Sequence, residues 1–247
     1  MKKRMRKLVS ILSVMALTIG MLSGCGSSET PVSQKGSSEA GTKTSEAPAT
    51  EAAASGDLTS GDIIKMAADA GQVGNWGLGN EYEILALLAK YGLPTEYLSQ
   101  DFTMDGFDDD SVTLASAMTY NELGLVKNDY DGGYGYGDSV ETIDMNDEGV
   151  AMMEDNIFCT KKFAEENPQT VAAFLYASFK GWEYAVENPE EAAEICYEYG
   201  SSVSPEHQAY MASEVAKLVS INTKGESVSD IGNIDEEAMQ QTLDFPL

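Results

Sequence analysis

Two short clusters of aromatic, amide, hydroxyl and carboxylate side chains are the residues of this sequence best suited to hold a small molecule. Residues 76–82 come between an expected strand and an expected helix, and residues 119–122 stand in the equivalent place after another strand. Open α/β sheets bind ligands at the carboxyl ends of their strands. The two clusters therefore predict a binding site made of Trp76, Gly77, Gly79, Asn80, Glu81, Tyr82, Thr119, Tyr120, Asn121 and Glu122.

The chemistry of these side chains suits an aromatic heterocycle. Trp76 and Tyr82 have faces that can stack on a ring, and Glu81 can accept a hydrogen bond from a ring amino group. Glycines let the backbone approach a ligand, and the free amides of a helix start can donate to it. Plainer roles stay open, because Trp76 also suits a hydrophobic core and Thr119 or Asn121 also suits a helix cap.

The other reactive side chains do not form a catalytic or metal-binding pattern. His207 is the single histidine and is expected to be solvated, in the first turn of an acidic helix, which argues against a zinc cluster or a catalytic triad. The acidic runs 101–110 and 129–141 lack the glycine and glutamate spacing of a calcium loop. Cys159 and Cys196 can pair outside a cell, although buried free thiols are expected. We therefore predict no metal, no cofactor and no enzymatic activity.

The composition limits the possible partners. The chain has 247 residues, 43% hydrophobic and 23% charged, which fits one globular domain or two small ones. Its 41 acidic and 15 basic residues give a net charge of -26. This charge argues against binding nucleic acid, and against docking on anionic lipid through a basic patch.

The N-terminal residues have the pattern of a secretory signal. Five basic residues precede an uncharged apolar run, Leu8–Leu22, whose 15 residues would form a helix of about 22 Å, short for a membrane span. Leu22-Ser23-Gly24-Cys25 at its end resembles the lipobox of bacterial lipoproteins. The resemblance implies removal of residues 1–24 and lipidation of Cys25, which would anchor the protein on the extracytoplasmic side of the cell membrane. A plain secretory signal with a chance cysteine is the alternative.

The remaining residues divide into a tether and a folded part with alternating elements. Residues 25–56 are rich in Ser, Thr, Ala, Glu and Gly, and cannot bury enough apolar surface to fold. Alternating short strands and helices after residue 57 favour an α/β fold with a parallel sheet. The expected strands are 72–76, 99–103, 112–117, 141–145 and 157–160, and the expected helices are 61–70 (capped by Ser60), 81–91, 121–126 and four that start near 168, 189, 205 and 235.

Several motifs between residues 73 and 219 carry a resemblance to a known family. They are Trp76-Gly77-Leu78-Gly79-Asn80-Glu81-Tyr82-Glu83, Gln100-Asp101-Phe102, Ala117-Met118-Thr119-Tyr120-Asn121-Glu122, Gly149 to Asp155, Asn167-Pro168 with Lys180-Gly181-Trp182, and Glu187-Asn188-Pro189-Glu190-Glu191-Ala192. In order and spacing they resemble the substrate-binding proteins of bacterial ABC importers, in the branch that binds thiamine pyrimidine precursors and is related to the nitrate, sulfonate and taurine binders. The resemblance implies a type II periplasmic-binding-protein fold, a small-molecule ligand, and permease and ATPase partners.

One part of this family's pattern is missing from the chain. Members open with a strand-rich part of the first lobe, whereas here the tether leads almost directly into the second. We therefore expect a near-complete α/β lobe over 57–156, followed over 157–247 by a hinge strand and the C-terminal helices of a truncated first lobe. Two alternatives to a solute-binding protein stay open, a non-binding remnant and an interaction or sensory lipoprotein. A third, an enzyme of the thiamine-pyrimidine type, is disfavoured because the chain lacks its cysteine-rich motif.

Overall fold

The computed structural model describes residues 7–12, 58–222, 224–228 and 230–244. Residues 7–12 and 59–244 belong to one compact unit. The predicted tether and Cys25 lie outside the described residues, as does most of the predicted signal peptide. The strands are β1 (Lys7–Leu12), β2 (Val73–Asn75), β3 (Leu98–Ser99), β4 (Leu114–Met118) and β5 (Val140–Asp144). The helices are α1 (Ser60–Asp69), α2 (Tyr82–Lys90), α3 (Asp105–Asp108), α4 (Glu122–Lys127), the short 3-10 helix η1 (Gly137–Ser139), α5 (Lys161–Glu166), α6 (Pro168–Glu187), α7 (Pro189–Glu198), α8 (Pro205–Ser220) and α9 (Glu236–Asp244).

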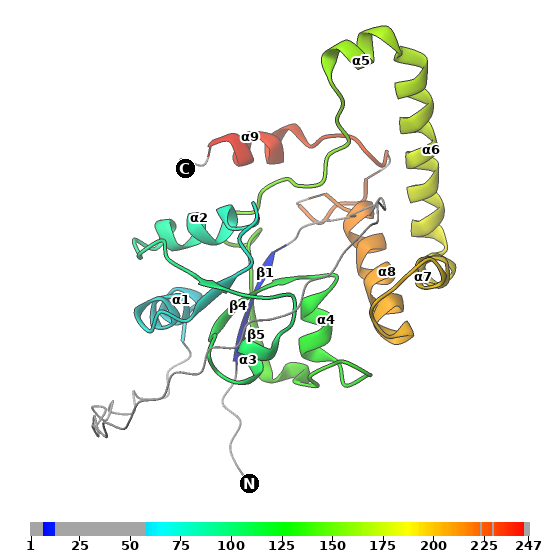
Figure 1. Cartoon of the computed structure of the whole chain (residues 1–247). Helices are drawn as coiled ribbons and strands as arrows, with labels where there is room; N and C mark the ends of the chain where they lie inside the picture. The colour runs from blue at the N-terminus through cyan, green and yellow to red at the C-terminus, as the bar shows by residue number, and fades with distance from the viewer. Residues whose placement is uncertain (1–6, 13–57, 223, 229, 245–247) are drawn as a thin grey trace, which may run out of the picture. The chain divides into compact units, whose positions relative to one another are not determined.

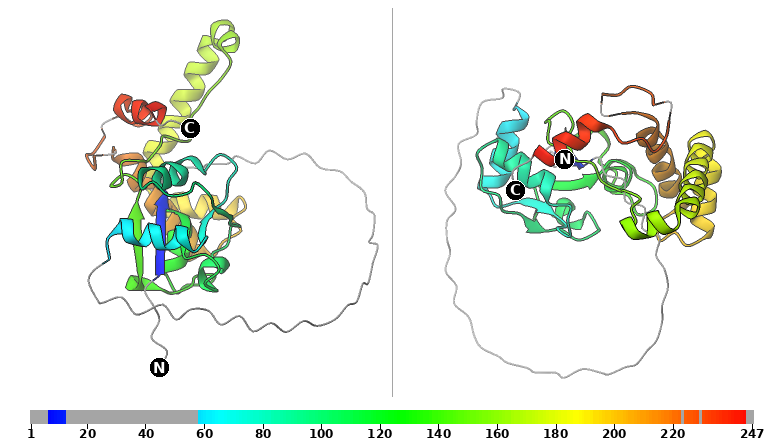
Figure 2. Two further views of the ribbon diagram at one scale, coloured as in Figure 1. Left: turned by 90° about the vertical axis from the view of Figure 1, so that its left-hand side faces the viewer. Right: turned by 90° about the horizontal axis from the view of Figure 1, so that it is seen from above.

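The five described strands form one parallel sheet in the order β3-β2-β4-β1-β5 (Figure 1). The predicted α/β class and parallel sheet are confirmed. β1 was not expected, because its residues belong to the run that we interpreted as a signal peptide. Figure 2 shows β1, in blue, lying beside the green strands of the sheet.

Helices cover both faces of this sheet and bury two separate apolar clusters. Successive side chains of a strand point to opposite faces, so Leu114 and Met118 of β4 pack with α1 and α2, whereas Ala115 and Ala117 pack with α3 and α4. All five residues of β4 are buried. The strand is therefore interior to the sheet and covered on both faces, as the near-continuous apolar sequence of a parallel strand requires.

The helix starts follow the sequence signals with two corrections. The N-cap of α1 is Thr59 and not Ser60, and its hydroxyl and the Asp62 carboxylate form a reciprocal capping box. Proline occupies the first turn of α6, α7 and α8 as expected, and Ser204 caps α8. Asn167 and Asn188 do not cap the helices that follow them, because each donates its side-chain amide to a carbonyl of the helix before it, those of Phe163 and Tyr184.

The strand predicted at residues 157–160 is wrong. The segment has no regular secondary structure, and Ile157 and Phe158 are 51% and 91% exposed. A β-branched and aromatic run forms a strand only where a neighbouring strand supplies backbone partners. None of the described strands lies beside residues 157–160.

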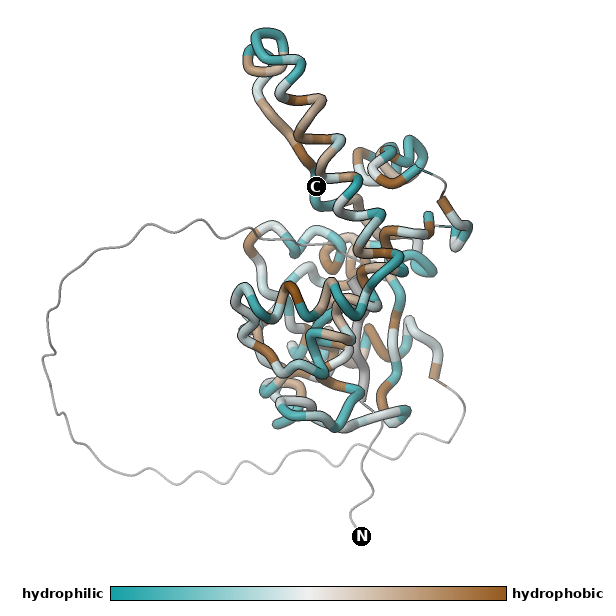
Figure 3. The backbone as a smooth tube through the Cα atoms, turned by 90° about the vertical axis from the view of Figure 1, so that its right-hand side faces the viewer, coloured by the Kyte–Doolittle hydropathy of each residue, from teal (hydrophilic) through white to brown (hydrophobic). Residues whose placement is uncertain are grey.

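The C-terminal helices pack mainly on one another. α8 contacts α6 and α7, and also α4 beside the sheet. Apolar residues recur along one face of the 20-residue helix α6, at Val171, Phe174, Leu175, Phe179 and Trp182. The helix has no buried residue, and Phe174 is 57% exposed. Figure 3 shows apolar residues recurring among polar ones along this helix. Val171, Leu175, Phe179 and Trp182 on the same face are half-buried, so the described chain covers this face only in part.

Candidate ligand-binding site

The loop between β2 and α2 is built around a buried asparagine. Asn75 is fully buried at the end of β2, and its side-chain oxygen accepts a hydrogen bond from the Gly77 amide at 2.7 Å. Its Nδ2 donates to the Asn80 carbonyl at 3.2 Å and to the Ser116 hydroxyl of β4 at 3.0 Å. Asn75 thus fixes both ends of the loop and joins it to the neighbouring strand.

The loop itself has an unusual backbone. Gly77, Leu78 and Gly79 have φ angles of 68°, 61° and 97°. Glycine adopts such angles freely, but for leucine the left-handed region costs about 1–2 kcal/mol. Leu78 is nevertheless 84% exposed, so its side chain gains no burial in return. The loop holds a strained shape at the carboxyl end of the sheet, the edge where open α/β sheets bind their ligands.

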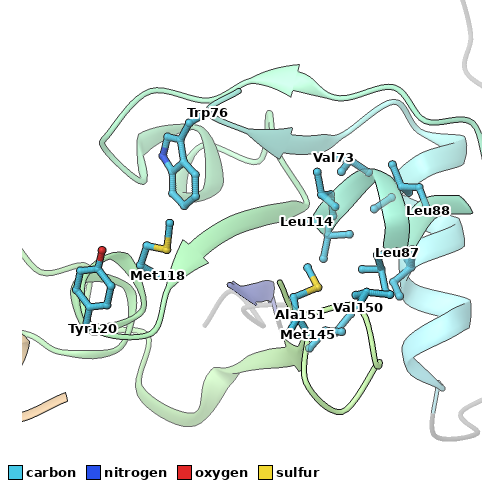
Figure 4. Close-up of a cluster of buried hydrophobic side chains, with 14 residues drawn as sticks. Val73, Trp76, Leu87, Leu88, Leu114, Met118, Tyr120, Met145, Val150 and Ala151 are labelled. Atoms are coloured by element: carbon cyan, nitrogen blue, oxygen red, sulfur yellow. The ribbon is translucent and has the colours of Figure 1, made fainter. Parts of the chain in front are cut away.

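The predicted site residues of this loop differ in how freely they face solvent. Tyr82 is 41% exposed, whereas Trp76 is only 8% exposed and belongs to the core cluster with Met118 and Tyr120 (Figure 4). The burial of Trp76 favours a core role for its indole ring over stacking of the ring on a ligand. Glu81 accepts a hydrogen bond from the Gly79 amide at 2.8 Å through one carboxylate oxygen and so closes the loop on itself.

The second loop, after β4, is held by a buried carboxylate. Glu122 is 3% exposed, and one of its oxygens accepts a hydrogen bond from the Met118 amide at 2.9 Å. Its other oxygen accepts one from Asn121 Nδ2 at 3.0 Å. Burial raises the pKa of Glu122, and these hydrogen bonds lower it in part. Asn121 stands at the N-cap position of α4, but its side chain caps no amide.

His207 is fully buried, so the prediction of a solvated histidine is wrong. Its Nε2 lies 2.8 Å from Asn121 Oδ1, and its Nδ1 lies 2.5 Å from the Tyr130 hydroxyl. Since an amide oxygen only accepts, Nε2 carries the proton and Nδ1 accepts from the tyrosine. Burial lowers the pKa of His207 to about 4. This neutral imidazole holds the Asn121 side chain in its orientation.

Three buried polar atoms at the carboxyl ends of β2 and β4 have no hydrogen-bond partner. They are Trp76 Nε1, Asn80 Oδ1 and Thr119 Oγ1. An unpartnered buried polar group costs about 1–3 kcal/mol, and such groups in a native protein need an explanation. Together they offer a donor, an acceptor and a hydroxyl that can be either. All three belong to residues that the sequence places in the binding site.

A fourth unpartnered atom, Glu83 Oε2, belongs to an acidic cluster on the α2 side of the same edge. Glu83 is 1% exposed, and its other oxygen accepts a hydrogen bond from the Met152 amide at 2.6 Å. Burial, and then the charges of Glu154 and Asp144, raise its pKa to about 8. Burial also raises the pKa of Glu154 to about 7 and of Asp155 to about 6. At neutral pH Glu83 is therefore a neutral acid with a hydrogen to donate.

A cavity of about 290 Å³ in the described part of the molecule has none of the ten predicted site residues in its lining. Its lining is Phe102, Thr103, Leu125, Asp131, Gly132, Tyr134, Ser202, Val203, Ser204 and His207. This cavity adjoins the second predicted loop through His207, which is hydrogen-bonded to Asn121.

The reactive groups singled out in the sequence are separated. Cys159 and Cys196 are free thiols, and both are exposed, which corrects the expectation that they would be buried. Within the described residues, no three His, Cys, Asp or Glu side chains are grouped so that they could hold a metal ion. The helices formed by these residues include none of the length and apolarity needed to cross a membrane.

Comparison with known proteins identifies the family of this chain. The family described as NMT1/THI5 like matches residues 62–192, more than half of the chain. The chain belongs to the NMT1/THI5-like family. This family consists mainly of substrate-binding proteins, and both predicted site loops lie within the matched residues. No curated protein and no solved structure matches the chain.

Sequence reasoning missed the buried residues that support the two loops. Asn75, Ser116 and Gln100 form a polar network between β2, β3 and β4, in which Gln100 exchanges two hydrogen bonds with the backbone of Ser116. The burial of Glu83 and of His207 was also missed. The available signal was a polar residue at an otherwise apolar position, as with Asn75 and Ser116 inside their strands.

Proposed function

We propose that this NMT1/THI5-like protein is the lipid-anchored, extracytoplasmic solute-binding component of a bacterial ABC importer. Its ligand would be a thiamine pyrimidine precursor or a similar small heterocycle. The family supports solute binding, and the lipobox-like sequence ending at Cys25 supports the anchor. The single observation that carries the ligand class is the set of three unpartnered polar atoms, Trp76 Nε1, Asn80 Oδ1 and Thr119 Oγ1.

An aminopyrimidine satisfies this set in chemical terms. A ring nitrogen accepts a hydrogen bond from the indole N–H of Trp76, and the neighbouring amino group donates to the amide oxygen of Asn80. The Thr119 hydroxyl serves either kind of group. Tyr82 is exposed enough to stack on the ring face. Asn121 and Glu122 have the oxygens named above engaged within the protein, so in this proposal they hold the second loop in shape.

The decisive variant is Thr119→Val, which removes one unpartnered hydroxyl and keeps the shape of the side chain. Because this hydroxyl has no partner in the protein, its loss leaves the free energy of unfolding unchanged or raises it by up to about 1 kcal/mol. A ligand that needs the hydroxyl binds about tenfold more weakly. Calorimetric titration of aminopyrimidines measures the second effect, and urea unfolding measures the first.

Thr113→Val is the matched control at the opposite end of β4. The Thr113 hydroxyl donates to Gln72 at 2.7 Å, far from the carboxyl edge of the sheet. This variant is expected to lose about 0.5–1.5 kcal/mol of stability and to bind ligand like the parent. Equal binding by the Thr119 variant and the parent would place the ligand elsewhere.

The anchor has a test of its own. If Cys25 is lipidated, a labelled fatty acid is incorporated into the parent chain, which then partitions into detergent. The Cys25→Ser variant takes up no label and stays in the aqueous phase or remains unprocessed. Unchanged detergent partitioning of this variant would contradict lipidation while leaving ligand binding as a separate question.

A further inference from the structure

The middle of the parallel sheet depends on one strand, β1. Its residues 8–12 pair with residues 114–118 of β4, and its residues 7–11 pair with residues 140–144 of β5. In the sheet order β4 and β5 are never neighbours. Adjacent strands lie about 4.8 Å apart, so β4 and β5 stand about 9.6 Å from each other, beyond hydrogen-bonding distance. Without β1, both would present an open backbone edge to the gap.

The proposed lipoprotein maturation removes this strand. Processing before Cys25 takes away residues 1–24 and with them all of β1, so the inference that follows rests on that part of the proposed function. In the remaining chain, β4 and β5 each have an edge of unpaired backbone groups that faces the gap left by β1. All five residues of β4 are buried. Buried backbone N–H and C=O groups are almost always paired, so such a gap has to be filled.

Apart from β1, none of the described strands lies between β4 and β5. Sliding β5 onto β4 would pull Ile143 out of the cluster with α1 and α2, and Val140 out of the cluster with α4, on opposite faces of the sheet. Close-packed cores do not absorb a shift of nearly 5 Å. The tether is a poor substitute, because residues 26–56 are dominated by Ser, Gly, Ala, Glu and Thr, most of which are weak strand formers.

We propose that, in the processed protein, the gap between β4 and β5 binds an extended segment of another polypeptide. The segment enters parallel to both strands and spans five or six residues. Residues 7–12, with the sequence Lys-Leu-Val-Ser-Ile-Leu, define the chemistry of this occupant, because they are the segment seated there. The sequence from Leu8 to Leu12 is uncharged and consists of apolar or small residues, a composition typical of strands covered by helices on both sides.

A synthetic peptide is the direct probe of this gap. The processed form, residues 25–247 with Cys25→Ser to avoid lipidation, is mixed with a peptide of residues 6–13. Binding is followed by fluorescence anisotropy, and the amides of β4 and β5 by hydrogen exchange. We expect saturable one-to-one binding and exchange slowed about tenfold or more at β4 and β5. If the processed form is poorly folded alone, the peptide is expected to restore its circular dichroism.

Two control peptides test the geometry. The first carries Val9→Pro and Ile11→Pro, which removes two backbone donors from the strand, and the second has the reversed sequence. Neither is expected to protect β4 or β5. Protection by the proline peptide would show general apolar binding and overturn the proposal.

Three further outcomes would also overturn it. The first is a monomeric processed form whose β4 and β5 amides are protected without peptide, since this chain would close its own gap. The second is a homodimer that protects the same amides and excludes the peptide, which would make a second copy the occupant. The third is a processed form that the peptide neither binds nor refolds. Fatty-acid labelling at Cys25 and aminopyrimidine titration are read separately, so failure of the strand gap is distinguishable from failure of the proposed function.

Discussion

The buried carboxyl of Glu83 is expected to make the protein less stable as the pH rises. Its pKa is raised from 4.5 to about 8, first by burial and then by the charges of Glu154 and Asp144. Between these two pH values the unfolded chain has released this proton, whereas the folded chain still holds it. The unfolded state therefore binds fewer protons, and the free energy of unfolding falls with rising pH across the window.

The variant Glu83→Gln isolates this effect. Glutamine keeps an oxygen to accept the 2.6 Å hydrogen bond from the Met152 amide, and it carries no charge at any pH. The difference between 4.5 and about 8, at 1.36 kcal/mol per pH unit, corresponds to about 5 kcal/mol. We expect parent and variant to be about equally stable near pH 4.5, and the variant to be about 3–5 kcal/mol more stable above pH 8.

Urea unfolding followed by circular dichroism at about pH 4.5, 6, 7.5 and 9 measures the difference between the two proteins. Glu96→Gln is the matched control, because it removes the same charge from an exposed side chain. The reasoning about Glu83 is refuted if the stability difference between the Glu83 variant and the parent does not change with pH, or if the Glu96 variant shows the same trend.

Three other predictions follow from the packing around α4, α6 and α8 and from the two thiols. Gly124→Ala places a Cβ 2.2 Å from the Tyr210 ring and is expected to lower the stability of the protein by about 1–3 kcal/mol. Gly181→Ala, where nothing lies within 4 Å of the new Cβ on α6, is expected to raise the stability by about 0.5–1 kcal/mol. Thermal unfolding compares the two variants with the parent. Burial lowers the pKa of His207 to about 4, so the free energy of unfolding of the parent is expected to fall by about 2–4 kcal/mol as the pH falls from 6.5 to about 4. The His207→Gln variant is expected to lack this fall in acid-unfolding curves. The same fall in the variant and the parent would contradict the prediction. In the Cys25→Ser variant, whose two thiols are Cys159 and Cys196, both are expected to react with a thiol reagent in the native protein. Mass spectrometry would show this as two added labels, and a single label or none would argue against their exposure.

Local signals in the sequence predicted most of the elements between residues 60 and 220. The Pro residues at 168, 189 and 205 mark helix starts because their missing N–H and fixed φ suit a first turn. The glycine loop after β2 and the turn after β4 were placed correctly because strand and helix patterns flank them on both sides. These signals act over a few residues, so they can be read from the sequence without knowledge of the fold.

Features that depend on distant partners could not be predicted in the same way. His207 is separated in sequence from Tyr130 by 77 residues and from Asn121 by 86, so nothing near it shows that it is buried. The segment 7–12 illustrates a different difficulty. An uncharged apolar run suits a signal peptide and a strand inside a parallel sheet equally well, because both environments exclude water and charge.

The junctions between α5, α6 and α7 consist of one residue each, Asn167 and Asn188. Each asparagine side-chain amide donates a hydrogen bond to the carbonyl four residues earlier. These bonds restrain each junction against rotation of one helix relative to the next. A helix of 20 residues is about 30 Å long. A displacement of α5 would therefore move α6 and, through it, α7. Helix α7 packs on α8, which bears His207. Packing contacts from α5 through α6 and α7 to α8, together with the hydrogen bond from His207, thus connect the Asn121 side chain to the far end of this row of helices.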